Sequence, residues 1–198
     1  QPFILANFNG TSGDIDVITH EFGHALHGIL AEGRYGSLTG TSVARDFVEL
    51  PSQIMENWAF EPEYLDTFAK HYQTGEIISQ ELIDKIVASK NYLAAYQQVR
   101  QLHFGILDMA WHSQTSLTGM STVEFEQNAL KDYQVMPVVE GTCISPAFSH
   151  IFAGGYSAGY YSYKWAEVLE ADAFSLFKEK GIFNREVSGS FRENILSK

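Results

Sequence analysis

The sequence has one cysteine, Cys143, among its 198 residues. An internal disulfide is therefore excluded, and a reducing compartment is the simpler interpretation, because disulfide-stabilised domains belong to oxidising compartments. We expect Cys143 to be a buried or half-buried thiol rather than a nucleophile, and we expect a cytoplasmic location.

Basic residues are also scarce. Lys and Arg together number 13, against 24 Asp and Glu, which gives a formal net charge of −11. Binding to nucleic acid requires a basic face, so nucleic acid is excluded as an expected partner. No apolar run approaches the length that spans a bilayer, so we expect no membrane partner either. Hydrophobic residues still make up 45% of the chain, which is enough to build a core.

Helical periodicity is the strongest pattern that the sequence does contain. Between Ser12 and Glu32, apolar residues recur at helical spacing, and a short strand is expected before them at Pro2–Phe8. No repeat or linker divides the chain. We therefore predict a mainly α fold with a small β element near the N-terminus, formed as a single domain over residues 1–198. Further helices are expected at 44–60, 64–72, 91–116 and 161–180, from Ser79, and from Asn184.

The first of these helices carries the pattern His20-Glu21-Phe22-Gly23-His24. Residues four apart share one face of a helix, so His20 and His24 can bind one metal ion. Zinc favours such nitrogen ligands, and a catalytic zinc keeps one position for water. Glu21 lies beside the first ligand, where a carboxylate can take a proton from that water and pass it to the leaving amine.

A third protein ligand is still needed. In the longer metzincin pattern, position 27 would be glycine and position 30 histidine, whereas this chain has His27 and Leu30. That pattern is excluded, and we expect His27 to support or pack beside the ligands rather than bind metal. A carboxylate on the next helix is the better candidate. Asp46, Glu49 and Glu56 all qualify, and their spacing alone does not choose among them.

Three blocks together resemble the thimet oligopeptidase family of zinc metallopeptidases, which includes oligopeptidase A and dipeptidyl carboxypeptidase. They are His20–His27 (HEFGHALH), Asp46–Gln53 (DFVELPSQ) and Ser149–Tyr163 (SHIFAGGYSAGYYSY). The resemblance covers nearly the whole chain and implies a multi-helix, zincin-like catalytic domain. The segment Asn9–Thr19 departs from it. That segment is shorter than in the oligopeptidase A branch and looks more like the oligoendopeptidase F branch.

Carried over residue by residue, the resemblance implies a role for each of five side chains. Glu49 would be the third zinc ligand and Glu21 the general base and acid. Tyr163 would donate its hydroxyl to the oxyanion of the tetrahedral intermediate. Tyr156 and His150 would contact the substrate near the scissile bond.

Asp16 lies four residues before His20, where members of the family commonly carry a carboxylate. Such a group can accept the free ring N–H of a zinc-bound histidine and fix its orientation. The alternative is that Asp16 is a solvated aspartate at the start of the helix with no role at the metal.

The resemblance implies zinc-dependent hydrolysis of short peptides with one zinc ion per chain. Full-length members are several times longer, so we expect a catalytic-region fragment. Its partners would be short peptides and the missing N-terminal region of the same parent chain, which forms the other wall of a channel. Two alternatives stay open. One is a dipeptidyl carboxypeptidase that releases C-terminal dipeptides, and the other is an inactive zinc-binding structural fragment.

Overall fold

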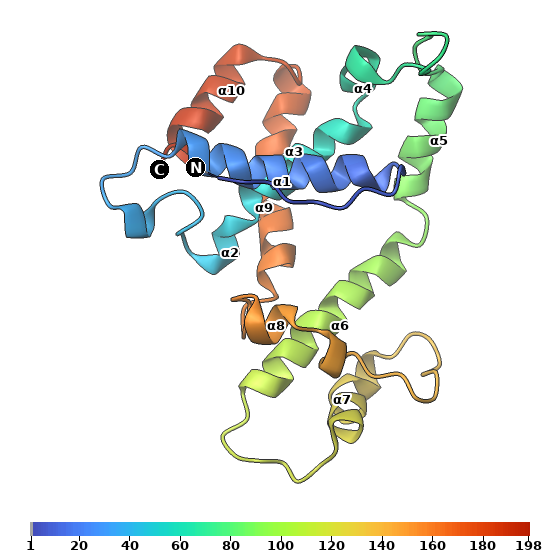
Figure 1. Cartoon of the computed structure of the whole chain (residues 1–198), viewed down its shortest axis with the longest axis vertical. Helices are drawn as coiled ribbons and strands as arrows, with labels where there is room; N and C mark the ends of the chain where they lie inside the picture. Colours follow the sequence, from blue (N-terminus) through green and yellow to red (C-terminus); the bar gives the residue numbers. More distant parts are fainter. Residues whose placement is uncertain (1) are drawn as a thin grey trace. The chain divides into compact units, whose positions relative to one another are not determined.

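The structure is a computed structural model that describes residues 2–198, and it is built almost entirely of helices (Figure 1). The α-helices are α1 (Gly13–Leu30), α2 (Arg45–Val48), α3 (Leu50–Glu56), α4 (Pro62–Phe68), α5 (Gln80–Lys90), α6 (Ala94–His112), α7 (Thr122–Leu130), α8 (His150–Ala153), α9 (Ser162–Lys180) and α10 (Arg185–Phe191). Shorter turns are η1 (Gly36–Leu38), η2 (Asn57–Phe60), η3 (Lys131–Tyr133), η4 (Ser145–Ala147) and the π-helical η5 (Arg192–Leu196). The mainly α prediction is confirmed.

The chain divides into two compact units, each of which is described by itself. Unit one comprises Gln1–Asn91 and Trp165–Lys198, and unit two comprises Tyr92–Lys164. The sequence predicts one domain over residues 1–198, and that remains a prediction. Within the described residues, no helix combines the length and apolarity needed to cross a bilayer.

The short strand expected at Pro2–Phe8 is absent. This segment forms no regular structure, and the pairing present in the described chain is an isolated antiparallel bridge between Lys70 and Ile77. A strand needs a neighbour for its backbone N–H and C=O groups, and none of the described segments supplies one here. The apolar side chains that suggested a strand point into solvent, with Phe3 90% and Leu5 97% exposed.

Helix α1 is anchored at its start by Asp14. Its carboxylate accepts the backbone N–H groups of Thr11 (3.0 Å), Asn9 (3.0 Å) and Gly10 (2.6 Å). The hydrogen bond from Thr11, followed by that from Asn9, lowers the pKa of Asp14 below its ordinary value. A carboxylate in the first turn is also favourable to the helix dipole. These bonds fix the point from which the helix and its histidines project.

The helix predicted at residues 44–60 is broken into α2, α3 and η2, and Glu49 lies at the first break. Pro51 causes the break. It occupies the first turn of α3, because it has no N–H to donate and its ring would collide with a preceding helical turn. The sequence predicts this choice for Pro51, a first turn or a kink, and the first-turn position is confirmed.

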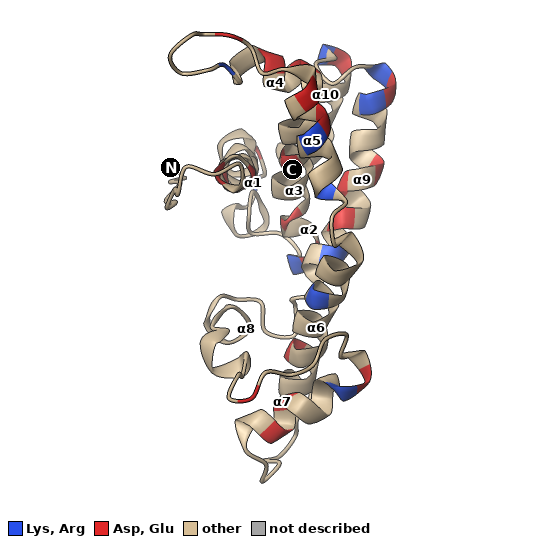
Figure 2. Cartoon of the chain, turned by 90° about the vertical axis from the view of Figure 1, so that its right-hand side faces the viewer, with Lys and Arg blue, Asp and Glu red and all other residues tan. Residues whose placement is uncertain are grey.

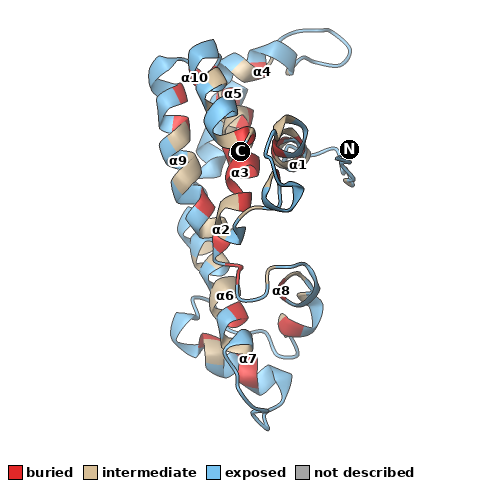
Figure 3. Cartoon of the chain, turned by 90° about the vertical axis from the view of Figure 1, so that its left-hand side faces the viewer, coloured by how far each residue is buried: buried red, intermediate tan, exposed pale blue. Residues whose placement is uncertain are grey.

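Gly23 lets α1 lie directly against the beginning of α3. A Cβ atom at Gly23 would come within 2.1 Å of the carbonyl oxygen of Pro51 and 2.5 Å of the Cα of Ser52. Those are backbone atoms, which cannot turn aside as a side chain can. In Figure 3 the buried positions of unit one gather on α3, where α1 covers it.

The apolar core of unit one joins the region around α3 to the C-terminal helices. Its buried members are Ile54, Phe174, Phe177, Ile182 and Val187. Trp58 packs edge-on against Phe174 and Phe177, at ring-centroid distances of 4.8 and 4.9 Å, and its indole N–H donates to the carbonyl of Ile182 (3.1 Å). In Figure 2, acidic positions lie along the middle of α9, and basic positions lie near its C-terminal end.

Unit two has a buried carboxylate in the middle of α7. The Ser121–Glu124 capping box expected at the start of that helix is confirmed. Farther along, Glu126 accepts the backbone N–H groups of Ile144 (2.8 Å) and Ser145 (2.7 Å) and the Ser145 hydroxyl (2.7 Å). Burial opposes ionisation of Glu126, but these hydrogen bonds outweigh it and lower its pKa. Glu126 thus ties the loop before η4 to α7.

Cys143 belongs to the same loop and is half-buried, as the sequence predicts. Its thiol donates to Glu126 (3.3 Å). Burial, the hydrogen bond and the nearby carboxylate all raise the pKa of Cys143. Since the thiolate is the nucleophilic form of cysteine, this environment keeps Cys143 unreactive.

We predict that Gly23→Ala will lower the free energy of unfolding by about 1–3 kcal/mol, because the new methyl group cannot be accommodated without separating α1 from α3. Gly28→Ala, on the same helix, is the matched control. A Cβ there meets only Pro2 at 3.8 Å, and alanine should stabilise the helix by up to about 1 kcal/mol. Urea unfolding of both variants is the measurement. If Gly23→Ala is as stable as Gly28→Ala, the close contact is not what joins these helices.

Candidate metal centre and tyrosine cluster

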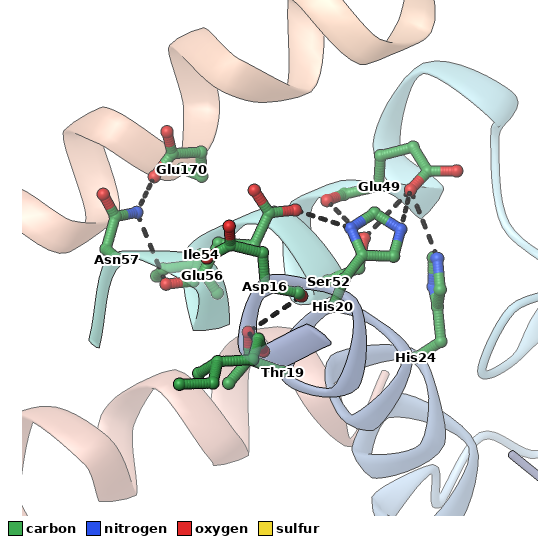
Figure 4. Close-up of polar contacts among 11 residues, drawn as sticks. Asp16, Thr19, His20, His24, Glu49, Ser52, Ile54, Glu56, Asn57 and Glu170 are labelled. Carbon is green, nitrogen blue, oxygen red and sulfur yellow. Dashed lines mark hydrogen bonds and ion pairs between the residues drawn. The ribbon is translucent and has the colours of Figure 1, made fainter. Parts of the chain in front are cut away.

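Three side chains of unit one converge in the way that a metal centre requires (Figure 4). His20 and His24 project from α1, and Glu49 projects from the break between α2 and α3. The Nε2 atoms of the two histidines lie 3.3 and 3.2 Å from the same oxygen, Oε2 of Glu49. The histidine rings are nearly perpendicular, at 84°, with centroids 5.0 Å apart. Among residues 2–198 this is the one group of His, Cys, Asp and Glu side chains with such spacing.

The distances fit the spacing of ligands around a zinc ion. Ligands of a tetrahedral zinc at about 2.1 Å lie about 3.4 Å from one another. A charged N–H···O hydrogen bond is shorter, at about 2.7–2.9 Å. The separations of 3.2 and 3.3 Å match the edge of a zinc tetrahedron better than a direct hydrogen bond. The donor set of two imidazoles and one carboxylate is also one that a catalytic zinc accepts.

Glu49 is almost completely buried, with its side chain 1% exposed. The Ser52 hydroxyl lies 2.9 Å from Oε2 of Glu49 and 2.9 Å from its backbone carbonyl. Burying a carboxylate is costly unless a positive charge and hydrogen bonds compensate for it. A divalent cation held by Glu49 and the two histidines would supply that compensation.

Glu56 contacts the ring nitrogen of His20 that faces away from Glu49. Its Oε1 lies 2.6 Å from Nδ1 of His20, which leaves Nε2 directed toward Glu49. Burial alone would lower the pKa of His20, but the nearby carboxylates of Glu49 and Glu56 outweigh it and raise the pKa to about 9. Without metal, His20 therefore carries a proton at neutral pH, which an incoming metal ion must displace.

The structure shows which of the three acidic residues considered as third ligand reaches both histidines. Glu49 reaches both histidines, Glu56 contacts only Nδ1 of His20, and Asp46 is outside the group of donors. His27 is also outside that group. It is fully buried, and neither ring nitrogen has a hydrogen-bond partner among the described residues. Burial lowers the pKa of His27, so it packs as a neutral ring.

Asp16 does not take the orienting role considered for it. In the described chain, the ring N–H partner of His20 is Glu56, and Nδ1 of His24 has no hydrogen-bond partner. Glu56 reaches His20 because it rises from α3, which lies against this face of α1. Asp16 is half-buried nearby, where burial and then the charge of Glu56 raise its pKa.

Glu21 follows the first histidine and is half-buried on α1. Among residues 2–198, its carboxylate makes no hydrogen bond or ion pair. Glu21 is next to His20 in the sequence and is not one of the three donors.

The predicted substrate-binding residues come together in unit two. His150, at the start of α8, and Tyr163, in the first turn of α9, share a hydrogen bond of 2.9 Å between Nε2 and the phenolic oxygen. Tyr156, in the loop between these helices, lies against both. Its ring centroid is 4.5 Å from that of His150 and 5.3 Å from that of Tyr163. The neighbouring Tyr160 is buried, and Tyr161 is exposed.

Comparison with known proteins agrees with the motifs. The model of peptidase family M3 matches residues 1–198. Oligopeptidase A of Escherichia coli (strain K12) is 49% identical over 207 residues, which cover 99% of this chain and 30% of that protein. Dipeptidyl carboxypeptidase of the same organism is 43% identical over 187 residues, 92% of this chain and 28% of that protein. Probable cytosolic oligopeptidase A of Arabidopsis thaliana is 42% identical over 193 residues, with coverages of 94% and 28%. The chain thus spans about 30% of the length of the curated relatives that it matches.

We predict different effects on zinc affinity for the three acidic residues near the histidines. Glu56→Gln should weaken zinc binding by roughly 10–100-fold, since it loosens the orientation of His20. Glu49→Gln should weaken binding further, because it removes a ligand. Asp46→Asn is the matched control and should leave the affinity unchanged. Competition with a chromophoric chelator measures all three. A larger loss in Asp46→Asn than in Glu49→Gln would overturn the ligand assignment.

Proposed function

The chain belongs to peptidase family M3, and we propose that it is the catalytic region of a zinc-dependent oligopeptidase that hydrolyses short peptides. The observation that carries the proposal is the convergence of His20, His24 and Glu49 at the spacing of zinc ligands, with Glu21 next to His20 in the sequence. The names of the relatives, oligopeptidase A and dipeptidyl carboxypeptidase, support the same reaction class.

In this proposal the three donors hold one zinc ion. When bound, zinc supplies a Lewis acid that polarises a carbonyl and lowers the pKa of a water molecule to roughly 7. Glu21 accepts a proton from the attacking water at its carboxylate. It then delivers that proton to the nitrogen of the leaving amine, so that the peptide C–N bond breaks and the carboxylate is regenerated.

Tyr163 stabilises the charge that develops during the attack. The carbonyl oxygen of the substrate becomes negative in the tetrahedral intermediate, and a phenolic O–H can donate to it. The partner of Tyr163 determines whether its proton is available. If His150 carries its proton on Nε2, it donates to the phenolic oxygen of Tyr163, and the O–H of Tyr163 does not donate to His150. His150 and Tyr156 also contact the substrate in this proposal.

We further propose that residues outside this sequence form the opposite wall of the substrate channel. The shorter span of this chain relative to its relatives supports this. So do the exposed apolar side chains of Phe3 and Leu5, which such a wall would cover. A cytoplasmic location is part of the proposal and agrees with the single cysteine and with the cytosolic name of one plant relative.

A dipeptidyl carboxypeptidase is the second candidate. The relative of that name is 43% identical, close to the 49% of oligopeptidase A. An inactive zinc-binding fragment is the non-enzymatic candidate. A zinc-loaded protein that fails to cleave a quenched fluorescent peptide would favour it.

We predict that Glu21→Gln in the intact protein will lower kcat by roughly 10²–10⁴-fold while zinc content stays at one ion per chain, because the amide cannot carry the proton. Glu32→Gln, the same chemical change at an exposed position beyond α1, is the control and should leave kcat unchanged. Turnover of a quenched fluorescent peptide, measured with metal analysis, gives both quantities. A zinc-loaded Glu21→Gln variant with parental kcat would sink the proposed mechanism.

The two peptidase candidates differ in their need for a free C-terminus. An exopeptidase that releases dipeptides must bind the terminal carboxylate, whereas an oligopeptidase cleaves internal bonds. We therefore expect a peptide and its C-terminally amidated form to be cleaved at similar rates, with internal fragments identified by mass spectrometry. Cleavage of the free peptide alone, with dipeptide release, would favour the second candidate.

A further inference from the structure

Unit two contains a buried carboxylate that the proposed reaction does not use. Asp108, on α6, is completely buried. Its Oδ1 accepts the backbone N–H of Ala158 (2.8 Å), and its Oδ2 accepts that of Tyr160 (2.9 Å). Nδ1 of His112, one turn later on α6, lies 2.7 Å from Oδ1. A buried charge is tolerated only with such compensation, so these contacts account for its presence.

The two backbone bonds hold a strained part of the loop between α8 and α9. Ala158 has a φ of 52°, in the left-handed region that residues with a Cβ avoid. That conformation costs about 1–2 kcal/mol for a residue other than glycine. The adjacent Gly159 closes a turn by donating to the carbonyl of Tyr156 (2.8 Å). The carboxylate of Asp108 thus supports an otherwise unfavourable backbone between Tyr156 and Tyr163.

Helix α6 holds the loop through side chains as well as through backbone bonds. The Tyr160 hydroxyl donates to Oε1 of Gln101 (2.9 Å), and the Tyr160 ring packs edge-on to Phe104, with centroids 5.5 Å apart. Positions 101, 104 and 108 fall on one face of a helix, so they form a continuous support under the loop.

The Tyr160 ring connects this part of the loop to the side chains of the proposed site, because it packs against two of them. Its ring centroid lies 5.1 Å from that of Tyr163 and 5.8 Å from that of His150. Tyr163 and His150 share the 2.9 Å hydrogen bond on which the oxyanion role depends. A shift of the Tyr160 backbone therefore moves the ring that packs against both.

We propose that Asp108 is a positioning residue of the peptidase reaction. It fixes the backbone at Ala158 and Tyr160 and thereby sets the places of Tyr163, His150 and Tyr156. This inference rests on the proposed function, because it concerns the geometry of that site. Asp108 is completely buried under the loop, so its effect reaches the chemistry only through the loop.

The test is Asp108→Asn in the intact, zinc-loaded protein. Asparagine keeps the size of the side chain, but its amide NH₂ faces one of the two backbone N–H groups and cannot accept from it. We expect kcat to fall by roughly 100-fold with KM nearly unchanged, because a small misplacement of a group that acts in the transition state lowers the rate of the chemical step.

Glu126→Gln is the matched control. Glu126 is another buried carboxylate of unit two that accepts N–H groups from a loop, and that loop carries no residue of the proposed site. We expect this variant to lose stability and to keep the parental kcat. Equal values of kcat in Asp108→Asn and Glu126→Gln would overturn the positioning role. If Glu21→Gln abolishes turnover in the same assays, the proposed function survives that result.

Amide hydrogen exchange in the parent protein provides a measurement that does not need a folded variant. The amides of Ala158 and Tyr160 should exchange slowly, and the same amides should exchange faster in Asp108→Asn when that variant folds. Fast exchange of both amides in the parent protein would overturn the inference, whatever the variant does.

Discussion

The contact between α1 and α3 at Gly23 is the constraint on which the candidate metal centre depends. Two helices that carry ordinary side chains pack with their axes 8–10 Å apart. At Gly23 a Cβ would come within 2.1 Å of the Pro51 carbonyl, so the helix backbone itself contacts α3. Residues on either side of Gly23 are thereby brought close to the beginning of α3, where Glu49 lies. A wider separation would leave the two histidine rings unable to share one oxygen of Glu49.

The chemistry of the centre follows from this contact because burial and ligand geometry arise together. Glu49 is buried by the same packing that directs His20 and His24 at it. A carboxylate in that position needs a positive charge, and the imidazoles need an acceptor. Glu56 adds a second acceptor on the far side of His20, so that ring cannot rotate without losing a hydrogen bond of 2.6 Å. The donors are therefore preorganised, and a metal ion that enters has little to rearrange.

The sequence predicts the parts of this arrangement that depend on local periodicity. The helix around residues 12–32, the capping box at Ser121 and the positions of His20 and His24 on one face all follow from spacing. Spacing does not choose among Asp46, Glu49 and Glu56, because the choice depends on where the second helix breaks. The break at Glu49, imposed by Pro51, turns that side chain toward α1. The resemblance to a known family identifies Glu49, whereas periodicity alone does not.

The sequence pattern does not predict other features, because they depend on contacts between distant segments of the chain. The largely apolar segment Pro2–Phe8 suggests a strand, but a strand needs a neighbouring segment to pair with, and the sequence pattern does not show whether one is present. Asp16 and Glu56 are both carboxylates near His20, and only the packing of α3 against α1 decides which one reaches Nδ1. The positioning role proposed for Asp108 has the weakest signal in the sequence. Its spacing of four from His112 indicates an ion pair on one helix, and nothing in that pattern points to a loop some 50 residues away.

These buried carboxylates share one physical role in a chain with an excess of acidic residues. Glu49, Asp108 and Glu126 are each withdrawn from water and each held by several N–H, O–H or imidazole groups. Such an arrangement is directional, unlike apolar packing, because each bond fixes both the position and the orientation of its donor. Glu49 orders donors on rigid helices, and Asp108 and Glu126 order loops that have few buried apolar residues of their own. Chemistry that depends on the placement of a phenol or an imidazole to within a fraction of an ångström requires such directional restraint, and apolar contacts alone do not provide it.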